Sequence, residues 1–154
     1  MSTHQSVVPA LQTGHVGLNV SSVNHSKEFY QQVFGFQVVN ESHEDSRQFA
    51  LLGVNGQVVV TLWQQSSGSF AKDAPSLHHL AFRVDTMDEV KVIETKLRAI
   101  KARFLYDGIV PHAEGTQSGG IFFEDPDGIR LEIFTPQGAA HLEAPSHGPT
   151  CGFF

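Results

Sequence analysis

The sequence has little of several features that mark specialised classes of protein. It contains one cysteine, Cys151, so an intrachain disulfide is excluded and no paired cysteine suits a zinc knuckle. Its 154 residues carry 10 basic and 16 acidic side chains without a basic run, which argues against a nucleic-acid or anionic-membrane surface. No apolar stretch approaches the roughly 18 residues of a membrane span. We therefore expect a compact domain that binds neither nucleic acid nor membrane.

The opening residues also lack the pattern of a secretion signal. MSTHQSVVPA has neither a basic segment nor an apolar one, and we expect a cytoplasmic protein. What stands out instead is nine histidines and twelve phenylalanines. Histidine is the commonest metal ligand, but scattered histidines are more often solvated or hydrogen-bonded. Each one therefore has to be placed before it is assigned a role.

The chain contains an internal repeat. The segment GHVGLNVSSV at 14–23 aligns with HHLAFRVDTM at 78–87, which places His15 over His79. A helical apolar pattern follows each segment, and runs with the period of strands follow each helix. The expected strands are 36–42, 47–53 and 57–63 in the first copy and 103–106, 119–124 and 129–134 in the second. Each copy thus predicts a βαβββ module, and the fold class is α+β.

Turn and cap signals support these boundaries. Gly35 is placed to end the first helix, and Thr86 with Glu89 forms a capping box at the start of the second. The turn Asp125-Pro126-Asp127-Gly128 joins the last two strands, because its residue types each favour a tight turn. The two copies are therefore marked by local signals as well as by periodicity.

The second copy is longer than the first. QVVVTLW at 57–63 aligns with GIRLEIF at 128–134, which places Thr61 over Glu132 at an offset of 71, against 64 for the histidines. The extra residues fall in the glycine-rich stretch 106–120, which we expect to be either a lid or a mobile loop. The expected organisation is a single domain, 1–154, made of module one (about 13–65), a linker (66–76), module two (about 77–136) and a tail (137–154).

Strand parity identifies the face of each strand that points away from the helices. Side chains alternate along a strand, so the apolar phase packs on the helices and the other phase does not. We refer to this second side as the helix-remote face. The residues assigned to it are His15, Gly17, Asn19, Thr61 and Trp63 in the first copy and His79, Ala81, Arg83, Arg130, Glu132 and Phe134 in the second.

Three of these residues suit a metal ion. If the two sheets curve into one another, their helix-remote faces line a common cleft that holds His15, His79 and Glu132. Neutral imidazole and carboxylate are matching ligands for a divalent transition metal, and three protein donors leave positions open for substrate. We expect His15, His79 and Glu132 to be metal ligands.

At these residues the chain resembles a known family. The paired βαβββ modules, the similar segments around His15 and His79, and the turn 125–128 leading to Glu132 resemble the vicinal oxygen chelate superfamily over residues 13–136. That superfamily includes glyoxalase I, extradiol dioxygenases, fosfomycin-resistance transferases, methylmalonyl-CoA epimerase and metal-free bleomycin-resistance proteins. The resemblance implies two modules forming a curved mixed sheet around a metal cleft. It further implies one divalent metal ion, Fe2+, Mn2+, Zn2+ or Ni2+, that chelates substrate through two neighbouring oxygens as a Lewis acid.

Departures from the family pattern separate the subfamilies only in part. The position of the fourth metal ligand in glyoxalase I and the epimerase corresponds to Thr61 here. A four-ligand site is therefore disfavoured, unless Gln64 or Gln65 reaches the metal. A site with three ligands matches the extradiol dioxygenases, but Phe122 occupies the position of their active-site tyrosine. Three ligands also match the fosfomycin transferases, but their threonine is Gly17 here. The reaction class therefore stays open between dioxygenase-like and glyoxalase-like chemistry.

Further candidates surround the expected cleft. His112 lies on the long loop and is the first candidate for acid–base chemistry, with Glu114 as the second. Arg83 and Arg130 are candidates to bind an anion, or simply pair with neighbouring carboxylates. The expected substrate-binding residues are Asn19, Thr61, Trp63, Arg83, Phe122, Arg130 and Phe134.

Two functions from different classes remain open at this stage. The first is a metalloenzyme, dioxygenase or lyase/isomerase, acting on a small oxygenated metabolite. The second is a metal-free sequestering protein of the bleomycin-resistance type that uses the same cleft as a binding groove. Both take a small molecule as partner, and a homodimer is open because the modules can pair within one chain or between two.

Overall fold

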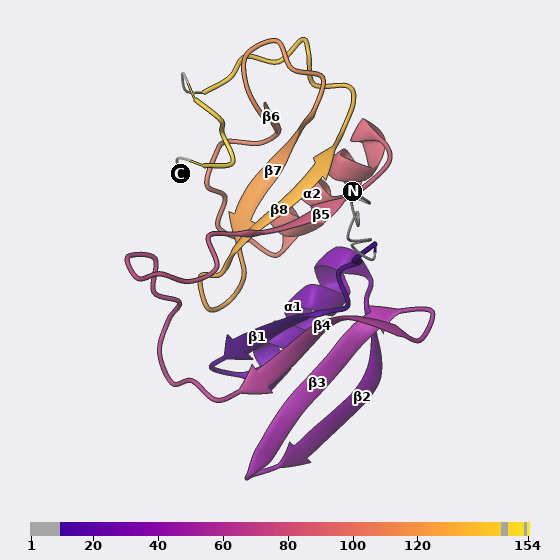
Figure 1. Cartoon of the computed structure of the whole chain (residues 1–154), viewed down its shortest axis with the longest axis vertical. Helices are drawn as coiled ribbons and strands as arrows, with labels where there is room; N and C mark the ends of the chain where they lie inside the picture. The colour runs from indigo at the N-terminus through magenta and orange to yellow at the C-terminus, as the bar shows by residue number, and fades with distance from the viewer. Residues whose placement is uncertain (1–9, 146–147, 153) are drawn as a thin grey trace, which may run out of the picture.

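The structure is a computed structural model that describes residues 10–145, 148–152 and 154. Two βαβββ modules follow one another along the chain, which confirms the α+β fold predicted from the repeat (Figure 1). The first module consists of β1 (Val16–Val20), α1 (Val23–Phe34), β2 (Gln37–Glu44), β3 (Arg47–Val54) and β4 (Gln57–Gln64). The second consists of β5 (Leu80–Arg83), α2 (Met87–Ala99), β6 (Val110–Pro111), β7 (Gly119–Glu124) and β8 (Arg130–Thr135).

Each module forms its own four-stranded mixed sheet. The order is β1-β4-β3-β2 in the first and β5-β8-β7-β6 in the second. In both sheets the first strand runs parallel to the last, and the other pairs are antiparallel. Gly17 lies opposite Thr61, and Ala81 lies opposite Glu132. Since Gly17 and Ala81 each stand two residues after the aligned histidines, the repeat register predicted from the sequence is confirmed.

One predicted strand lies elsewhere. The run 103–106 makes a single bridge, between Phe104 and Phe123, and the edge strand forms at Val110–Pro111 instead. Between the two, Gly108 adopts a φ of 88°, a left-handed conformation that breaks the extended backbone. Pro111 has no N–H with which to lengthen the ladder, so β6 stays short.

The predicted helix ends are confirmed. The Ser22 side chain caps α1 by accepting a hydrogen bond from the His25 N–H, and Gly35 ends the helix with a φ of 72°. Thr86 and Glu89 form the predicted capping box of α2. In the part of the chain that the structure describes, neither helix is long and apolar enough to cross a membrane.

The two modules share one hydrophobic core, and α1 lies within it. On one side α1 packs on its own sheet; on the other, Phe34 meets Phe82 and Phe123, with ring centroids 5.0 and 6.3 Å apart. Phe82 and Phe123 project from the helix side of the second sheet, beside α2. The helix sides of both sheets therefore point inward, and the two helix-remote faces point away from each other. Among the described residues, the hollow between the modules is lined by residues 12–14, 16, 57–59 and 80–83, and His15, His79 and Glu132 are not part of it.

The Asp-Pro-Asp-Gly turn of the second module accepts hydrogen bonds from residues of the first. Tyr30 of α1 donates a hydrogen bond to Asp125 Oδ2 (3.1 Å), and the Ser21 N–H and hydroxyl both donate to the Asp127 carboxylate. Asp125 is buried, and burial raises its pKa from 3.8 to about 6 although the Asp127 and Ile129 N–H groups donate to it. The turn is thus a structural element of the module interface.

Candidate metal centre

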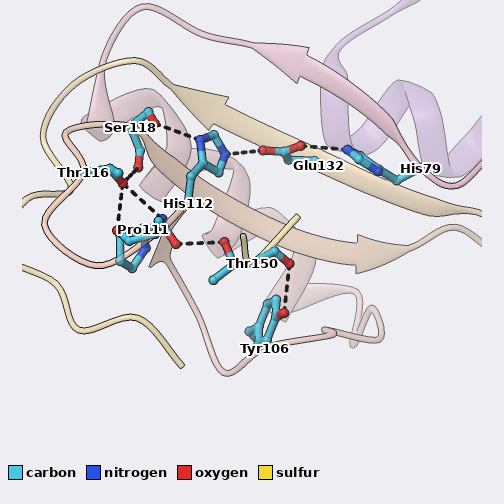
Figure 2. A network of polar contacts seen from close by, with 9 residues as sticks. His79, Tyr106, Pro111, His112, Thr116, Ser118, Glu132 and Thr150 are labelled. Atoms are coloured by element: carbon cyan, nitrogen blue, oxygen red, sulfur yellow. Dashed lines mark hydrogen bonds and ion pairs between the residues drawn. The ribbon is translucent and has the colours of Figure 1, made fainter. Parts of the chain in front are cut away.

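The helix-remote face of the second sheet brings three predicted site residues together. Glu132 projects from β8, where it is 3% exposed, and its two carboxylate oxygens face two different imidazoles. The Oε2 atom lies 3.2 Å from His79 Nε2, and the Oε1 atom lies 2.6 Å from His112 Nε2 (Figure 2). His79 stands directly before β5, which runs beside β8. The parallel pairing of these two strands therefore sets the contact between His79 and Glu132.

The surroundings of His79 favour the neutral form of its imidazole. Burial lowers its pKa below the ordinary value, and the Glu132 carboxylate opposes this shift. A neutral imidazole is the form that binds a metal ion. The other ring nitrogen, Nδ1, lies 2.8 Å from Nδ1 of His78, so Nε2 is the atom turned toward Glu132.

The long loop of the second module delivers His112 to the carboxylate. The His112 N–H donates to the Ser118 carbonyl (3.0 Å), and the Ser118 hydroxyl lies 2.9 Å from His112 Nδ1. If that hydroxyl donates to Nδ1, then Nε2 carries the proton and donates to Glu132. Each ring nitrogen of His112 therefore has a hydrogen-bond partner: Nδ1 contacts the Ser118 hydroxyl, and Nε2 contacts the Glu132 carboxylate. The acid–base role of His112 stays a prediction.

The first module carries its candidate residues on the other sheet. His15 and Asn19 are exposed, and Trp63 is 38% exposed and donates from Nε1 to the Thr61 hydroxyl (2.9 Å). The ring of Phe49 lies 5.3 Å from Trp63. Among residues 10–145, 148–152 and 154, no three His, Cys, Asp or Glu side chains gather where they could hold a metal ion. One chain thus presents a His79–Glu132 pair, with His15 on a different surface.

The remaining candidates differ in their surroundings. Phe134 lies beside His112, with ring centroids 5.4 Å apart, and Phe122 is fully buried on the face that carries Glu132. The Arg83 Nη2 atom lies 3.9 Å from Asp85 Oδ1. Arg83 therefore pairs with a neighbouring carboxylate, which was the alternative to anion binding. The Nε atom of Arg130 is buried without a hydrogen-bond partner. Arg130 is therefore the better placed of the two arginines to bind an anion.

The comparisons with known proteins agree with this fold. The sequence profile of the Glyoxalase/Bleomycin resistance protein/Dioxygenase superfamily matches residues 12–133. The chain belongs to this superfamily. It is 31% identical over 131 residues to Uncharacterized protein YaeR of Escherichia coli strain K12, which covers 80% of this chain and 95% of that one. The match with the superfamily confirms the resemblance seen in the sequence.

Solved structures of the glyoxalase fold are also similar. A glyoxylase/bleomycin resistance protein/dioxygenase domain from Frankia sp. EAN1pec matches with a TM-score of 0.70 at 24% identity, over 84% of this chain and 100% of that one. The fosfomycin resistance protein FosX of Listeria monocytogenes, in complex with Mn(II) and sulfate, matches with a TM-score of 0.60 at 18% identity, over 84% and 93% of the two chains. At these identities the likeness concerns the fold.

Several residues near the site had no signal in the sequence. Ser118 contacts His112, and Thr150 accepts, through its carbonyl, a hydrogen bond from the Tyr106 hydroxyl (2.8 Å). The ring of Phe154 lies 5.4 Å from that of Phe122. The tail lies outside the region that the superfamily profile matches, and neither composition nor periodicity places it on the second sheet. Only the extra length of the loop 106–120 pointed to this region.

Proposed function

We propose that this protein is a divalent-metal-dependent enzyme of the vicinal oxygen chelate superfamily that acts on a small oxygenated metabolite. We assign the metal to His79 and Glu132 of one chain and to His15 of a second copy in a homodimer. The observation that carries the proposal is the His79–Glu132 pair, with its 3.2 Å separation, on the helix-remote face. The proposal is supported by the contacts of Phe34 with Phe82 and Phe123, which bring the helix sides of the two sheets into one core. We infer that the helix-remote faces point away from each other and that His15 meets this pair between chains.

The donor set fits a divalent transition metal. Glu132 is almost completely buried, and its partners are two imidazoles rather than a lysine or arginine. A buried carboxylate is stable only when it is paired, hydrogen-bonded or bound to a metal. Burial lowers the pKa of His79 and so favours its neutral form, and a neutral imidazole with a carboxylate suits Mn2+, Fe2+, Zn2+ or Ni2+. The Mn(II) complex of FosX makes manganese the first metal to test.

A two-fold dimer accounts for the exposed surface of the first module. In such a dimer the first sheet of each copy lies against the second sheet of the other, so that one contact occurs twice. The Trp63 and Phe49 rings, which lie on the open face, are then covered. His15 belongs to the same face by strand parity and reaches the site with them. Each dimer has two sites, and each site takes residues from both chains.

The side chains of this protein have separable roles in the proposal. The bound metal supplies a Lewis acid for a substrate with two neighbouring oxygens. His112, oriented by Ser118, holds the Glu132 carboxylate in position. Trp63 and Phe134 form aromatic walls, which suit a flat or apolar substrate. The reaction is dioxygenase-like or glyoxalase-like; Phe122, which has no hydroxyl, disfavours the dioxygenase.

Metal analysis tests this proposal directly. Protein purified without chelator or nickel resin is expected to bind about one Mn2+ per chain, and His79→Ala and Glu132→Ala are expected to lose it. His25→Ala is the matched control, because His25 is exposed on α1 and remote from the site by topology. Substoichiometric metal that His79→Ala leaves unchanged contradicts the proposal. Oxygen uptake with catechols then separates the dioxygenase from the lyase or isomerase.

A metal-free binding protein is the second candidate. It is favoured by the finding that, within one chain, no three His, Cys, Asp or Glu side chains of the described residues are placed so that they could hold a metal ion. The aromatic residues beside Glu132 suit a sequestered small molecule equally well. Metal-independent binding of a small aromatic molecule, with no metal retained by the dimer, supports this candidate over the enzyme.

A further inference from the structure

The site face carries a guanidinium for which the described residues supply no carboxylate partner. Arg130 stands two residues before Glu132 on β8, and strand parity places it on the same face. Its Nε atom is buried without a hydrogen-bond partner, and no described residue forms an ion pair with it. Because buried polar groups in native proteins are nearly always hydrogen-bonded, this donor indicates a missing ligand atom.

The ring of Phe154 covers this guanidinium. The Arg130 Cζ atom lies 5.2 Å from the ring centroid, within the range of a cation–π contact. The ring also packs among aromatic side chains that include the metal-ligand candidate His79. The centroid distances are 5.4 Å to His78 and Phe122, 6.0 Å to His79 and 6.1 Å to Tyr106. A side chain of the tail thus fills an aromatic box directly beside the proposed metal ligands.

The tail is anchored before Phe154 rather than at it. The Thr150 backbone N–H donates to the His112 carbonyl (2.9 Å). The Thr150 hydroxyl donates to the Pro111 carbonyl (2.8 Å), as Figure 2 shows. After Thr150, the described residues 151, 152 and 154 make no hydrogen bond to the sheet; Gly152 donates back to Pro149 within the tail. Phe154 is therefore able to leave the box while Thr150 stays in place.

We propose that the substrate pairs an anionic group with a flat aromatic group, as a small aromatic carboxylate does. Arg130 binds the anion, and the aromatic group takes the box that Phe154 fills in the free chain. This inference rests on the proposed function, because the position of the substrate follows from His79 and Glu132. An anion accepts from the unpaired Nε–H in the two-point geometry that arginine favours.

The arrangement makes Phe154 an internal competitor. A ligand that binds only the open form has an apparent affinity reduced by the fraction of molecules in that form. Removing the ring raises that fraction, so the affinity for an aromatic anion increases. Removing the guanidinium lowers the affinity for the anion but not for a neutral aromatic molecule. These opposite effects distinguish a competing side chain from a permanent wall of the pocket.

Calorimetry with benzoate tests the proposal in the full-length, metal-free protein. Phe154→Ala is expected to bind benzoate at least about fivefold more tightly than the unmodified protein. In the Phe154→Ala background, Arg130→Gln is expected to weaken benzoate binding about tenfold or more. Arg98→Gln is the matched control, since Arg98 is exposed on α2 and pairs with Glu94, and it is expected to leave binding unchanged.

One further variant and one neutral probe separate the effect of charge from other effects. Arg130→Lys retains a cation, so it is expected to bind benzoate more tightly than Arg130→Gln, which separates loss of charge from loss of fold. Benzyl alcohol, a neutral probe, is expected to bind Arg130→Gln and its parent equally. The proposal is overturned if Phe154→Ala binds benzoate no more tightly, or if Arg130→Gln behaves as Arg98→Gln does. Because benzoate is measured without metal, failure of the metal centre leaves this result readable on its own.

Discussion

Replacing Asp125 with asparagine should change how the stability of the protein depends on pH. Burial raises the pKa of Asp125 from 3.8 to about 6, so the folded protein holds its proton more tightly than the unfolded chain does. The stability that this proton contributes is fully present below the unfolded pKa and is lost as the pH rises through about 6. In Asp125→Asn the side chain is neutral at every pH, and this dependence disappears.

The size of the effect follows from the shift. A difference of about two pKa units, at about 1.4 kcal/mol each, corresponds to about 3 kcal/mol between the fully protonated and fully ionised protein. The asparagine Oδ1 atom can still accept from the Asp127 and Ile129 N–H groups, which both donate to Asp125 Oδ1. The stability of the variant relative to the unmodified protein is therefore expected to rise by about 3 kcal/mol from acid to neutral pH.

Urea unfolding at fixed protein concentration measures this difference. Free energies of unfolding are compared at about pH 4.5 and about pH 7.5, between which about 2 kcal/mol of this difference is expected, because part of it is already lost between the unfolded pKa of 3.8 and pH 4.5. Titrations of other groups cancel because both proteins share them. Asp45→Asn, at an exposed residue of the β2–β3 turn, is the control for the loss of one carboxylate. A difference for Asp125→Asn that does not change with pH refutes the reasoning.

Three other changes have defined outcomes. A Cβ atom on Gly120 would lie 2.0 Å from the Ile133 carbonyl oxygen, so Gly120→Ala is expected to lower soluble yield and the urea midpoint, while Gly68→Ala, which meets open space, is neutral in both. Thr86→Ala removes the capping box and is expected to cost about 1 kcal/mol in urea unfolding; an unchanged midpoint contradicts this. Ser118→Ala is expected to weaken Mn2+ binding about tenfold in calorimetry without lowering the urea midpoint, and unaltered affinity argues against positioning through His112.

The architecture was predictable because its signals are local and repeated. Apolar periodicity, the Thr86 capping box and the alignment of Thr61 with Glu132 each depend on neighbouring residues or on the repeat, and the structure confirms them. The strand predicted at 103–106 was wrong because Gly108 breaks the extended backbone before the edge strand forms. That correction concerns one turn and leaves the βαβββ order intact.

The candidate site was only partly predictable. Strand parity placed Glu132 and Arg130 on one face, and the extra loop length pointed to the region of His112. The relative placement of the modules was not predictable. It depends on α1, which packs against both sheets through Phe34, and in the sequence Phe34 has the pattern of an ordinary core residue. The docking of Phe154 likewise depends on distant contacts that leave no local pattern.

Metal binding by mixed variants tests the central claim most directly. His15→Ala and Glu132→Ala chains, each expected to bind no Mn2+ alone, are unfolded together and refolded as a mixture. If each site combines His15 of one chain with Glu132 of the other, half of the dimers regain one intact site, and the metal content rises to about a quarter of the unmodified value. Metal that stays absent from the mixture, or that His15→Ala retains in full on its own, contradicts a site shared between two chains.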